Sequence, residues 1–453
     1  MTRELSRSHG SGEENPRTKV HAELARDAVV WGLPLVMLGR YLEAAVDQGV
    51  PFNRFFMNAD IATPRSGAIG PNIDTLNGRA WFDLSEGPQV IEVPDTDDRY
   101  YSIHLQDMYM NSFAYIGRRT YGTRAGTFVL TPPGYKGSLP AGATEVAATT
   151  DKVFAFLRIL VRSRDDLPAV RALSERFSTA PAAAVSGGRR AAEVSADILD
   201  RFQPAARRLR GVLPHDDLRT AGLTYYDELN SLLATHPPSA ADTRHLSRFA
   251  QLGIGPGKEV ARDEPARGVL EAAVPAGIDL ALASLEDWSD NGWSRRRNIA
   301  PFIEDPTQRA ANNIYGPSTQ VAEESVFFNL WDGPDGEVLS GETKRYRLRF
   351  PAGGLPPVDA FWSLTLYDRK RYALFDNPLD RYGFSDRSPD VRFGPDGSLE
   401  IRIQSADPGP SAQNWLPAPR EPFELILRTY QPRAEVLDRT YTPPAIELLE
   451  GTR

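Results

Sequence analysis

The sequence of 453 residues contains no cysteine, which excludes disulfide bonds, thiolate metal ligands and a cysteine nucleophile. Histidine is scarce, since there are only six and none follows residue 245. A metal site made of several histidines therefore cannot be assembled from the C-terminal half alone. We expect a protein with no metal site and no other cofactor.

Long apolar runs are also lacking, because no stretch approaches the roughly 18 apolar residues of a membrane span. The first residues, MTRELSRSHGSGEENPRTKV, include basic side chains but no apolar core behind them, unlike a secretory signal. We expect a disordered leader over residues 1–18 and a cytoplasmic protein with no membrane partner.

Positive charge is in deficit, and 52 lysines and arginines against 60 acids give a net charge of −8. A nucleic-acid-binding domain is usually basic, so we expect no nucleic-acid partner. The hydrophobic fraction of 41% is that of a globular protein. The many Tyr, Asn and Asp residues on strand faces that should otherwise be apolar lead us to expect a small-molecule substrate as its partner.

Motifs of several familiar chemistries are missing as well. The chain has no G-x-S-x-G elbow, no P-loop, no G-x-G-x-x-G turn and no HEXXH pair. Their absence argues against an ordinary α/β-hydrolase, nucleotide cradles of these types and a HEXXH metalloprotease.

Hydrophobic periodicity divides the chain into parts of different texture. Residues 19–49 have apolar residues at helical spacing, interrupted near Gly32 and Pro34. Short apolar and aromatic segments bounded by Gly, Pro and Asp follow to about residue 160 and return from about 320 to 435. Such segments are typical of sandwiches and barrels. The part between them, rich in Ala, Arg, Leu and Asp, is expected to be helical.

The sequence therefore predicts an α+β fold, mainly β, with two β-sandwich or jelly-roll-like domains. We place an N-terminal helix and the first β domain at 19–165, a mainly helical connecting region at 166–319 and a C-terminal β-sandwich domain at 320–453. The two β regions are loosely similar in pattern, since each has a Tyr-rich strand, a Gly/Asp turn and then an alternating strand. Sheet edges without protection often pair, so one expectation is a homodimer.

Several motifs carry a resemblance to a known family. They are PNIDTL, AWFDLSEGP and RYYSIHLQDMYMNSFAYIG in the N-terminal part, and FWSLTLYD, NPLDRYGFSDRSP and NWLPAP in the C-terminal part. The chain resembles bacterial proteins that join domain of unknown function 1254 to domain of unknown function 1214. The resemblance implies two β domains packed together with helices between them, and it implies no particular chemistry. Leu76, Asn77 and His104 depart from the residues that the family more usually shows.

The first candidate site is the polar segment with Asn72, Asp74, Thr75 and Asn77. In an extended chain Asn72 and Asp74 share one face, and Thr75 and Asn77 share the other. Asn and Asp also cap turns by bonding the backbone two residues on, which is the structural interpretation. The functional hypothesis makes Asp74 a general base, with Asn72 and Thr75 binding substrate.

The second candidate site is the segment YYSIHLQDMYMNSF. If it is one strand, Tyr101, Asp107, Tyr109 and Asn111 lie on one face, as in a pocket wall with a few polar groups. We assign Asp107 and Tyr109 to catalysis, and Tyr101 and Asn111 to substrate binding. His104 points the other way and would be catalytic, because the ordinary pKa of histidine lies near neutrality. A half-buried strand with a structural histidine is the alternative.

The third candidate site lies in the C-terminal region. In FWSLTLYD, Trp362 shares a face with two leucines, whereas Ser363, Thr365 and Tyr367 form a hydroxyl-bearing face. We assign Tyr367 to catalysis and Trp362 to substrate binding. The rigid NWLPAP loop is expected to close the pocket, with Asn414 and Trp415 binding substrate. The structural alternative is that these residues fill the space between the two domains, which would require the same residue types.

Two arginines complete the candidate set. Arg158 and Arg162 share one face of FLRILVRS if it is a strand, and that spacing suits a carboxylate or phosphate. We assign Arg158 to substrate binding. A plain salt bridge is the alternative for both.

These features favour a cofactor-independent small-molecule enzyme that uses acid/base chemistry in a pocket between the β domains. It would be a hydrolase, or a lyase, isomerase or cyclase. The composition, rich in Arg, Ala and Pro, resembles that of a cytoplasmic actinobacterial protein and suits specialised metabolism. The alternative is a non-catalytic carbohydrate or small-ligand binding sandwich, whose tryptophans would stack on sugar rings. The tryptophans in question are Trp81, Trp331, Trp362 and Trp415.

Overall fold

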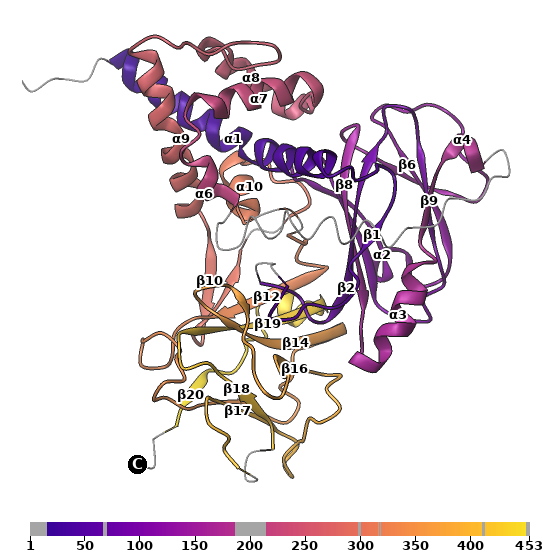
Figure 1. The fold of residues 1–453 in the computed structure, drawn as a ribbon, viewed down its shortest axis with the longest axis vertical. Coiled ribbons are helices and arrows are strands. Elements are labelled where there is room, and N and C mark those ends of the chain that lie inside the picture. The colour runs from indigo at the N-terminus through magenta and orange to yellow at the C-terminus, as the bar shows by residue number, and fades with distance from the viewer. Residues whose placement is uncertain are drawn as a thin grey trace, which may run out of the picture.

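The computed structural model describes residues 16–66, 70–185, 214–297, 300–315, 317, 319–409 and 413–449. The leader expected over residues 1–18 lies outside the described residues up to residue 15, and the first helix begins at Pro16. Figure 1 shows a group of helices beside two β units, one from the N-terminal part of the chain and one from the C-terminal part.

The helices pack around α1 (Pro16–Asp47), which contacts four helices of the connecting region. The four are α7 (Leu223–Thr235), α8 (Ala240–Phe249), α9 (Ala266–Ala283) and α10 (Pro306–Asn313), and the short helix α6 (Pro214–Leu218) packs against α9. Pro34 lies inside α1, so the interruption expected near Gly32 and Pro34 is wrong. A proline inside a helix costs about 3 kcal/mol. Burial of Trp31, Leu33 and Leu35 beside it offsets that cost.

The α1 helix is also long and apolar enough, by length and composition, to cross a membrane over Lys19–Asp47. The expectation of no membrane partner stays a prediction. Inside this protein, 72% of the most apolar window is buried. Its apolar residues join one core cluster with residues of α7 and α9, as in the central helix of a bundle.

The first β unit packs two sheets around one apolar core. The larger sheet has the order β1-β2-β8-β4-β5 and the smaller has the order β7-β6-β3-β9. The strands are β1 (Phe56–Met57), β2 (Thr75–Asp83), β3 (Gln89–Val93), β4 (Tyr101–Gln106), β5 (Ser112–Gly117), β6 (Gly126–Thr131), β7 (Thr144–Ala147), β8 (Lys152–Leu160) and β9 (Ser178–Pro181). Short helical segments lie between them: α2 (Arg118–Tyr121), η1 (Arg164–Asp166), α3 (Leu167–Ser174) and, after β9, α4 (Ala182–Val185). Because β9 pairs with β3, this unit extends past the boundary predicted at residue 165.

The second β unit is a sandwich of the same kind around its own core. Its larger sheet has the order β10-β11-β12-β19-β14-β15, with β16 also on β14, and its smaller sheet has the order β18-β17-β13-β20. The strands are β10 (Asp287–Asp290), β11 (Trp293–Arg296), β12 (Ser325–Leu330), β13 (Tyr346–Phe350), β14 (Val358–Asp368), β15 (Ala373–Leu374), β16 (Gly383–Ser385), β17 (Leu399–Gln404), β18 (Trp415–Pro417), β19 (Phe423–Pro432) and β20 (Ile446–Leu448). The remaining short helices are η3 (Ala250–Leu252) and α11 (Ala434–Leu437). Since β10 and β11 extend the larger sheet, strands of this unit begin before residue 320.

The two β units repeat one topology. The order β2-β8-β4 in the first larger sheet corresponds to β12-β19-β14 in the second, and β7-β6-β3-β9 corresponds to β18-β17-β13-β20. The pairs β6–β7 and β17–β18 are both parallel, while the other equivalent pairs are antiparallel. The loose echo between the two β regions of the sequence is therefore an internal structural repeat.

The strand registers extend this match to single residues. Ser102 lies opposite Arg158 in the first unit, as Ser363 lies opposite Arg428 in the second. Thr75 lies opposite Leu160, as Ser325 lies opposite Tyr430. Ser102 also lies opposite Gly117, as Ser363 lies opposite Ser385. Counting along the strands from these pairs makes the following residues equivalent: Asp74 and Glu324, Tyr100 and Phe361, Arg119 and Arg387, Leu160 and Tyr430.

The expected α+β class is confirmed, with an N-terminal helix, a helical connecting region and two packed β units. The jelly-roll variant stays a prediction that the strand orders do not confirm.

Candidate functional site

The two β units meet through the outer faces of their larger sheets. In β14 the side chains of Trp362, Leu364 and Leu366 join the core of the second unit. Ser363 and Tyr367, on the opposite face, bond to the segment that leads into β2. Strand alternation in FWSLTLYD predicted this hydroxyl-bearing face, and the structure confirms it.

Four apolar and aromatic side chains form the centre of the contact between the units: Tyr100, Leu160, Phe361 and Tyr430. The ring of Phe361 stacks on that of Tyr430 with centroids 4.2 Å apart and meets the edge of Tyr100 at 5.3 Å. These residues are the equivalent pairs of the repeat. The two units thus face each other in an approximately two-fold related arrangement.

Two buried acids flank this centre and are held in reciprocal fashion. Asp74, just before β2, accepts hydrogen bonds from Ser363 Oγ at 2.6 Å and from Arg387 Nη2 at 2.7 Å. Glu324, just before β12, accepts from Arg119 Nε at 2.7 Å and from the Tyr100 hydroxyl at 2.8 Å. Each acid is therefore paired with the equivalent arginine of the other unit.

A cavity of about 110 Å³ opens at the Asp74 end of the contact, and both units line it. Asp74 is the acid of the lining, and the bases are Arg162, Arg164 and Arg387. The remaining lining residues are mostly hydroxyl-bearing or apolar: Ser163, Ser363, Ser385, Ser388, Ile61, Ile73, Val161 and Phe384. The junction of the units thus combines an acid, hydroxyls and several positive charges in one space.

Three of the predicted site residues hold the segment that carries Asp74. The Asn72 side chain accepts from the Asp74 backbone N–H at 2.6 Å and donates to the Tyr430 hydroxyl at 2.7 Å. The hydroxyl of Thr75 donates to Asn77 at 2.7 Å, and that of Tyr367 donates to the Pro71 carbonyl at 2.7 Å. Burial raises the pKa of Tyr367, so its hydroxyl stays protonated. These residues position Asp74 rather than line the cavity.

His104 lies on the outer face of β4 and is fully buried. Its ring stacks on Tyr115 with centroids 4.5 Å apart, and its Nε2 lies 2.8 Å from Ser112 Oγ. Burial, and then the charge of Arg158, lower the pKa of His104 well below its ordinary value. The lowered pKa favours the neutral imidazole, and His104 does not line the cavity, so its catalytic role stays a prediction.

Arg158 and Arg162 do not share a strand face as predicted, because β8 ends at Leu160. Arg158 is buried in the contact between the units, where its guanidinium lies 4.2 Å from the centre of the Phe156 ring. Arg162 is exposed and lines the cavity. The two guanidinium groups therefore belong to different environments.

Asp107, Tyr109 and Asn111 do not continue the face of Tyr101, because β4 ends at Gln106. The Asp107 carboxylate accepts from the backbone N–H groups of Tyr109 and Asn111, both at 2.9 Å, and closes a turn. The Tyr109 hydroxyl donates to the His236 carbonyl at 2.8 Å. The structure thus gives these residues a turn-stabilising role, and the predicted pocket wall is wrong.

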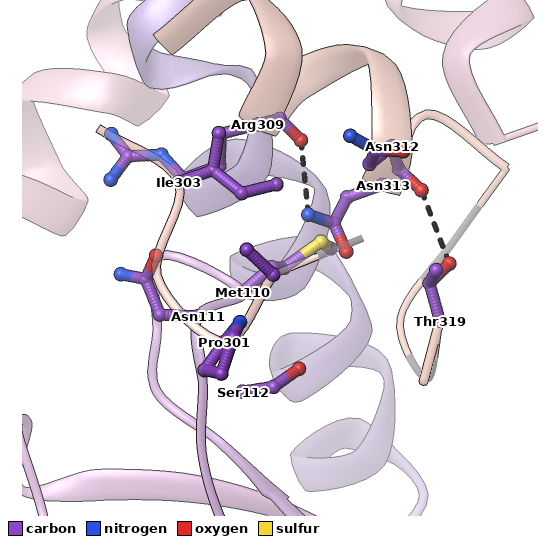
Figure 2. Close-up of a pocket in the computed structure, with 10 residues that line it drawn as sticks. Met110, Asn111, Ser112, Pro301, Ile303, Arg309, Asn312, Asn313 and Thr319 are labelled. Atoms are coloured by element: carbon purple, nitrogen blue, oxygen red, sulfur yellow. Dashed lines mark hydrogen bonds between the residues drawn. The ribbon is translucent and has the colours of Figure 1, made fainter. Parts of the chain in front are cut away.

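Asn111 also borders a hollow of about 10 Å³ beside α10, shown in Figure 2. The side chains of Asn313 and Thr319 in this view bond to the backbone carbonyls of Arg309 and Asn312. A space of this size holds about one water molecule. It is too small for a substrate.

Four further predicted substrate-binding residues lie elsewhere. Tyr101 and Trp362 are buried in the cores of the first and second sandwich, respectively. The Asn414 side chain donates to the carbonyls of Arg392 and Glu400, and Trp415 Nε1 donates to the Gln404 carbonyl. The NWLPAP loop therefore braces the smaller sheet of the second unit, and its predicted closure of the pocket is wrong.

The lining residues to which the sequence analysis assigned no role include Ser363, Arg164 and Arg387. Ser363 lay on the predicted hydroxyl-bearing face, and Arg387 lies within the family motif NPLDRYGFSDRSP, so both had a signal. Arg164 had none. Within the part of the chain that the structure describes, no group of three histidine or acidic residues could hold a metal ion.

The chain matches two family models. Residues 52–181 match the model described as Protein of unknown function (DUF1254), and residues 324–434 match the one described as Protein of unknown function (DUF1214). No curated protein matches the sequence.

Two solved structures are similar to the chain. The VPA0106 protein from Vibrio parahaemolyticus has a TM-score of 0.71 and 21% identity, over 95% of this chain and 100% of that one. An uncharacterized protein from Burkholderia cenocepacia has a TM-score of 0.42 and 13% identity, over 97% of this chain and 91% of that one. The first likeness supports the fold.

Proposed function

Since the chain belongs to the proteins that join a DUF1254 domain to a DUF1214 domain, two families described only as of unknown function, we propose its function from the site itself. The proposed function is that of a small-molecule enzyme that uses acid/base chemistry, without a cofactor, in the cavity between the two β units. The observation that carries the proposal is the placement of Asp74 and Ser363, hydrogen-bonded at 2.6 Å, in the lining of one cavity.

Asp74 is the proposed proton acceptor. Its carboxylate is held by Arg387, so its position is set before a substrate arrives. The Ser363 hydroxyl donates to the same carboxylate and provides a route by which a proton reaches Asp74 from the cavity. Arg387 then supplies positive charge beside the reacting group.

The class of reaction follows from the mass of the product. A hydrolase adds the mass of water, an isomerase or cyclase leaves the mass unchanged, and a lyase lowers the mass of the larger product. A cyclase or lyase would suit the role in specialised metabolism expected from the sequence. Compounds that copurify with the native protein, together with an ester and lactone panel, are the first substrates to test.

The matched test compares the two equivalent acids of the repeat. Asp74→Asn and Glu324→Gln each remove the charge of a buried acid that pairs with an arginine of the other unit. We expect Asp74→Asn to lower kcat/KM by about 100-fold or more, the range typical of a lost general base. Glu324→Gln should leave turnover per folded molecule within a few-fold of the native value, although both variants lose stability.

Turnover is measured by mass spectrometry, well below the melting temperature of each variant. Equal turnover in Asp74→Asn and the native protein would contradict the proposal. A loss of equal size in both variants would also contradict it, since only Asp74 is assigned to the chemistry.

A non-catalytic ligand-binding protein is the second candidate. It is favoured by the structural role of Asp74, whose two oxygens each already accept a hydrogen bond, one from Arg387 and one from Ser363. Saturable binding of a panel compound with no product after long incubation would support it. The carbohydrate version is less well supported, because Trp81 and Trp362 are buried in apolar clusters and cannot stack on a sugar.

A further inference from the structure

We propose that the cavity beside Asp74 takes a small anionic substrate, whose carboxylate or phosphate group binds at Arg162 and Arg164. This inference rests on the proposed function and names its substrate class. The lining of the cavity is positively charged, with three arginines and one aspartate, although the whole chain has a net charge of −8. Asp74 is already neutralised by Arg387.

Arg162 and Arg164 are exposed residues of the lining, directly after β8. Across the described residues neither guanidinium forms an ion pair. The nearby acid Asp166 is occupied, because Arg99 holds both of its oxygens, at 2.6 and 2.9 Å. The two guanidinium groups flank Ser163, which also lines the cavity, and together they present donors to an oxyanion.

The internal repeat shows that the fold does not require arginine at these positions. Because Leu160 corresponds to Tyr430, residues 162 and 164 correspond to Pro432 and Ala434. The second unit has these uncharged residues at the end of β19, which runs to Pro432, and continues into α11, as the first continues from β8 into η1 and α3. The two arginines are thus specific to the end of the contact that holds the cavity.

Positive charge also lies behind the cavity. Arg428 is adjacent to Ser363 in the sheet and is 2% exposed, and its Nε and Nη1 atoms have no hydrogen-bond partner among the described residues. The Nε of Arg387 is likewise buried without a partner. All of these atoms are donors with no lone pair to offer. Arg387 lines the cavity, whereas Arg428 does not, so Arg428 acts on a ligand only through its charge. The charge of an anionic ligand would be attracted to this end of the molecule.

The size and placement of the cavity set the orientation of the ligand. A volume of about 110 Å³ admits a small molecule or one end of a larger one. With the anionic group at Arg162 and Arg164, the rest of the ligand can reach Asp74 and Ser363, which line the same cavity. The arginines would bind and orient the substrate, while the acid and the hydroxyl would act on it.

The test uses benzoate and inorganic phosphate as anionic probes and benzamide as the uncharged match of benzoate. Binding to the full-length protein is measured by calorimetry at low ionic strength, where exposed charges are least screened. We expect saturable binding of at least one of the two anions and no binding of benzamide. The probe that binds distinguishes a carboxylate from a phosphate preference.

Two double variants with the same change in net charge provide the control. Arg162→Gln with Arg164→Gln should weaken anion binding at least tenfold, whereas Arg171→Gln with Arg176→Gln, two exposed residues nearby, should change it less than twofold. All four positions are exposed, so folding is preserved. Equal losses in both double variants would overturn the proposal, as would equal binding of benzoate and benzamide or no binding of either anion.

Failure here is distinguishable from failure of the proposed function. Turnover of a neutral panel compound that depends on Asp74, without anion binding, would reject the anionic substrate and retain the enzyme. Anion binding that requires Arg162 and Arg164, with no product from any bound compound, would support the substrate-binding site and reject the catalysis.

Discussion

Buried acids in this protein differ in whether an ion pair compensates their charge. Asp74 and Glu324 each pair with an arginine from the other unit, which compensates for the loss of hydration. Glu424, on the outer face of β19, accepts a hydrogen bond from Trp331 Nε1 at 2.9 Å and forms no ion pair within the described chain. Burial raises the pKa of Glu424 to about 7. Its charge therefore changes within the range in which the protein would be handled.

We predict that Glu424 makes the protein less stable as the pH rises. With a pKa raised from 4.5 to about 7 in the folded state, the folded protein binds more protons than the unfolded chain between these values. The free energy of unfolding then falls as the pH rises from 4.5 to 7, by on the order of 3 kcal/mol in total. Glu424→Gln should remove this part of the pH dependence and raise the melting temperature at pH 8.

Thermal melts of the native protein and the variant between pH 5 and pH 8 check this prediction. Glu421→Gln is the control, because Glu421 is exposed just before the same strand. A variant curve parallel to the native one over the whole range would show that Glu424 is already ionised when folded.

At the scale of elements, the largest helical contact depends on a close approach of α1 to α9. Gly277 in α9 faces Val29 in α1, and a Cβ atom added at Gly277 would lie 2.7 Å from Val29 Cγ1 and 2.8 Å from its Cβ. Both residues are buried, and a β-branched valine in a helix has little freedom to move aside. The absence of a side chain at Gly277 therefore sets the distance between the two helices.

Gly277→Ala should destabilise the protein by about 1–3 kcal/mol, the usual cost of overpacking, despite the better helix propensity of alanine. Gly268→Ala is the matched control in the same helix. There the added Cβ meets only the end of the flexible Glu264 side chain, at 3.0 Å. We expect the control to be neutral or slightly stabilising in urea unfolding. A neutral Gly277→Ala would mean that α1 and α9 separate without loss of stability.

At the scale of the whole molecule, the two sandwiches are joined face to face through a few large side chains. Phe361 touches Tyr100, Tyr430 and the guanidinium of Arg387, which lies 4.4 Å from its ring centre. This residue contributes to the contact between the units rather than to the core of either sandwich. The cooperativity of unfolding should therefore depend on it.

Calorimetric unfolding should show one transition for the native protein and two for Phe361→Ala. Replacing a buried phenylalanine by alanine lowers the free energy of unfolding by about 3–5 kcal/mol. Here the loss weakens the contact between the units rather than the core of either sandwich. Phe350→Ala, inside the second sandwich, is the control and should give a single transition at lower temperature. A single lowered transition in Phe361→Ala would show that other contacts suffice to couple the units.

Local chemistry determined much of the architecture directly from the sequence. Alternation with a period of two placed Ser363 and Tyr367 opposite Trp362, because side chains of a strand must point to alternate faces. The helical periodicity of residues 19–49 likewise predicted α1, although a buried position let the helix continue through Pro34. The strand pattern failed at Asp107, where the carboxylate bonds two backbone N–H groups and ends the strand in a turn.

The partners of Asp74 were decided by the tertiary structure alone. Ser363 and Arg387 are 289 and 313 residues away along the chain, and a periodic pattern carries no information over such separations. The same holds for the pairing of Glu324 with Arg119 and for the arginines that line the cavity. Sequence periodicity defines which face of an element is buried, whereas a site between two units exists only when their faces meet.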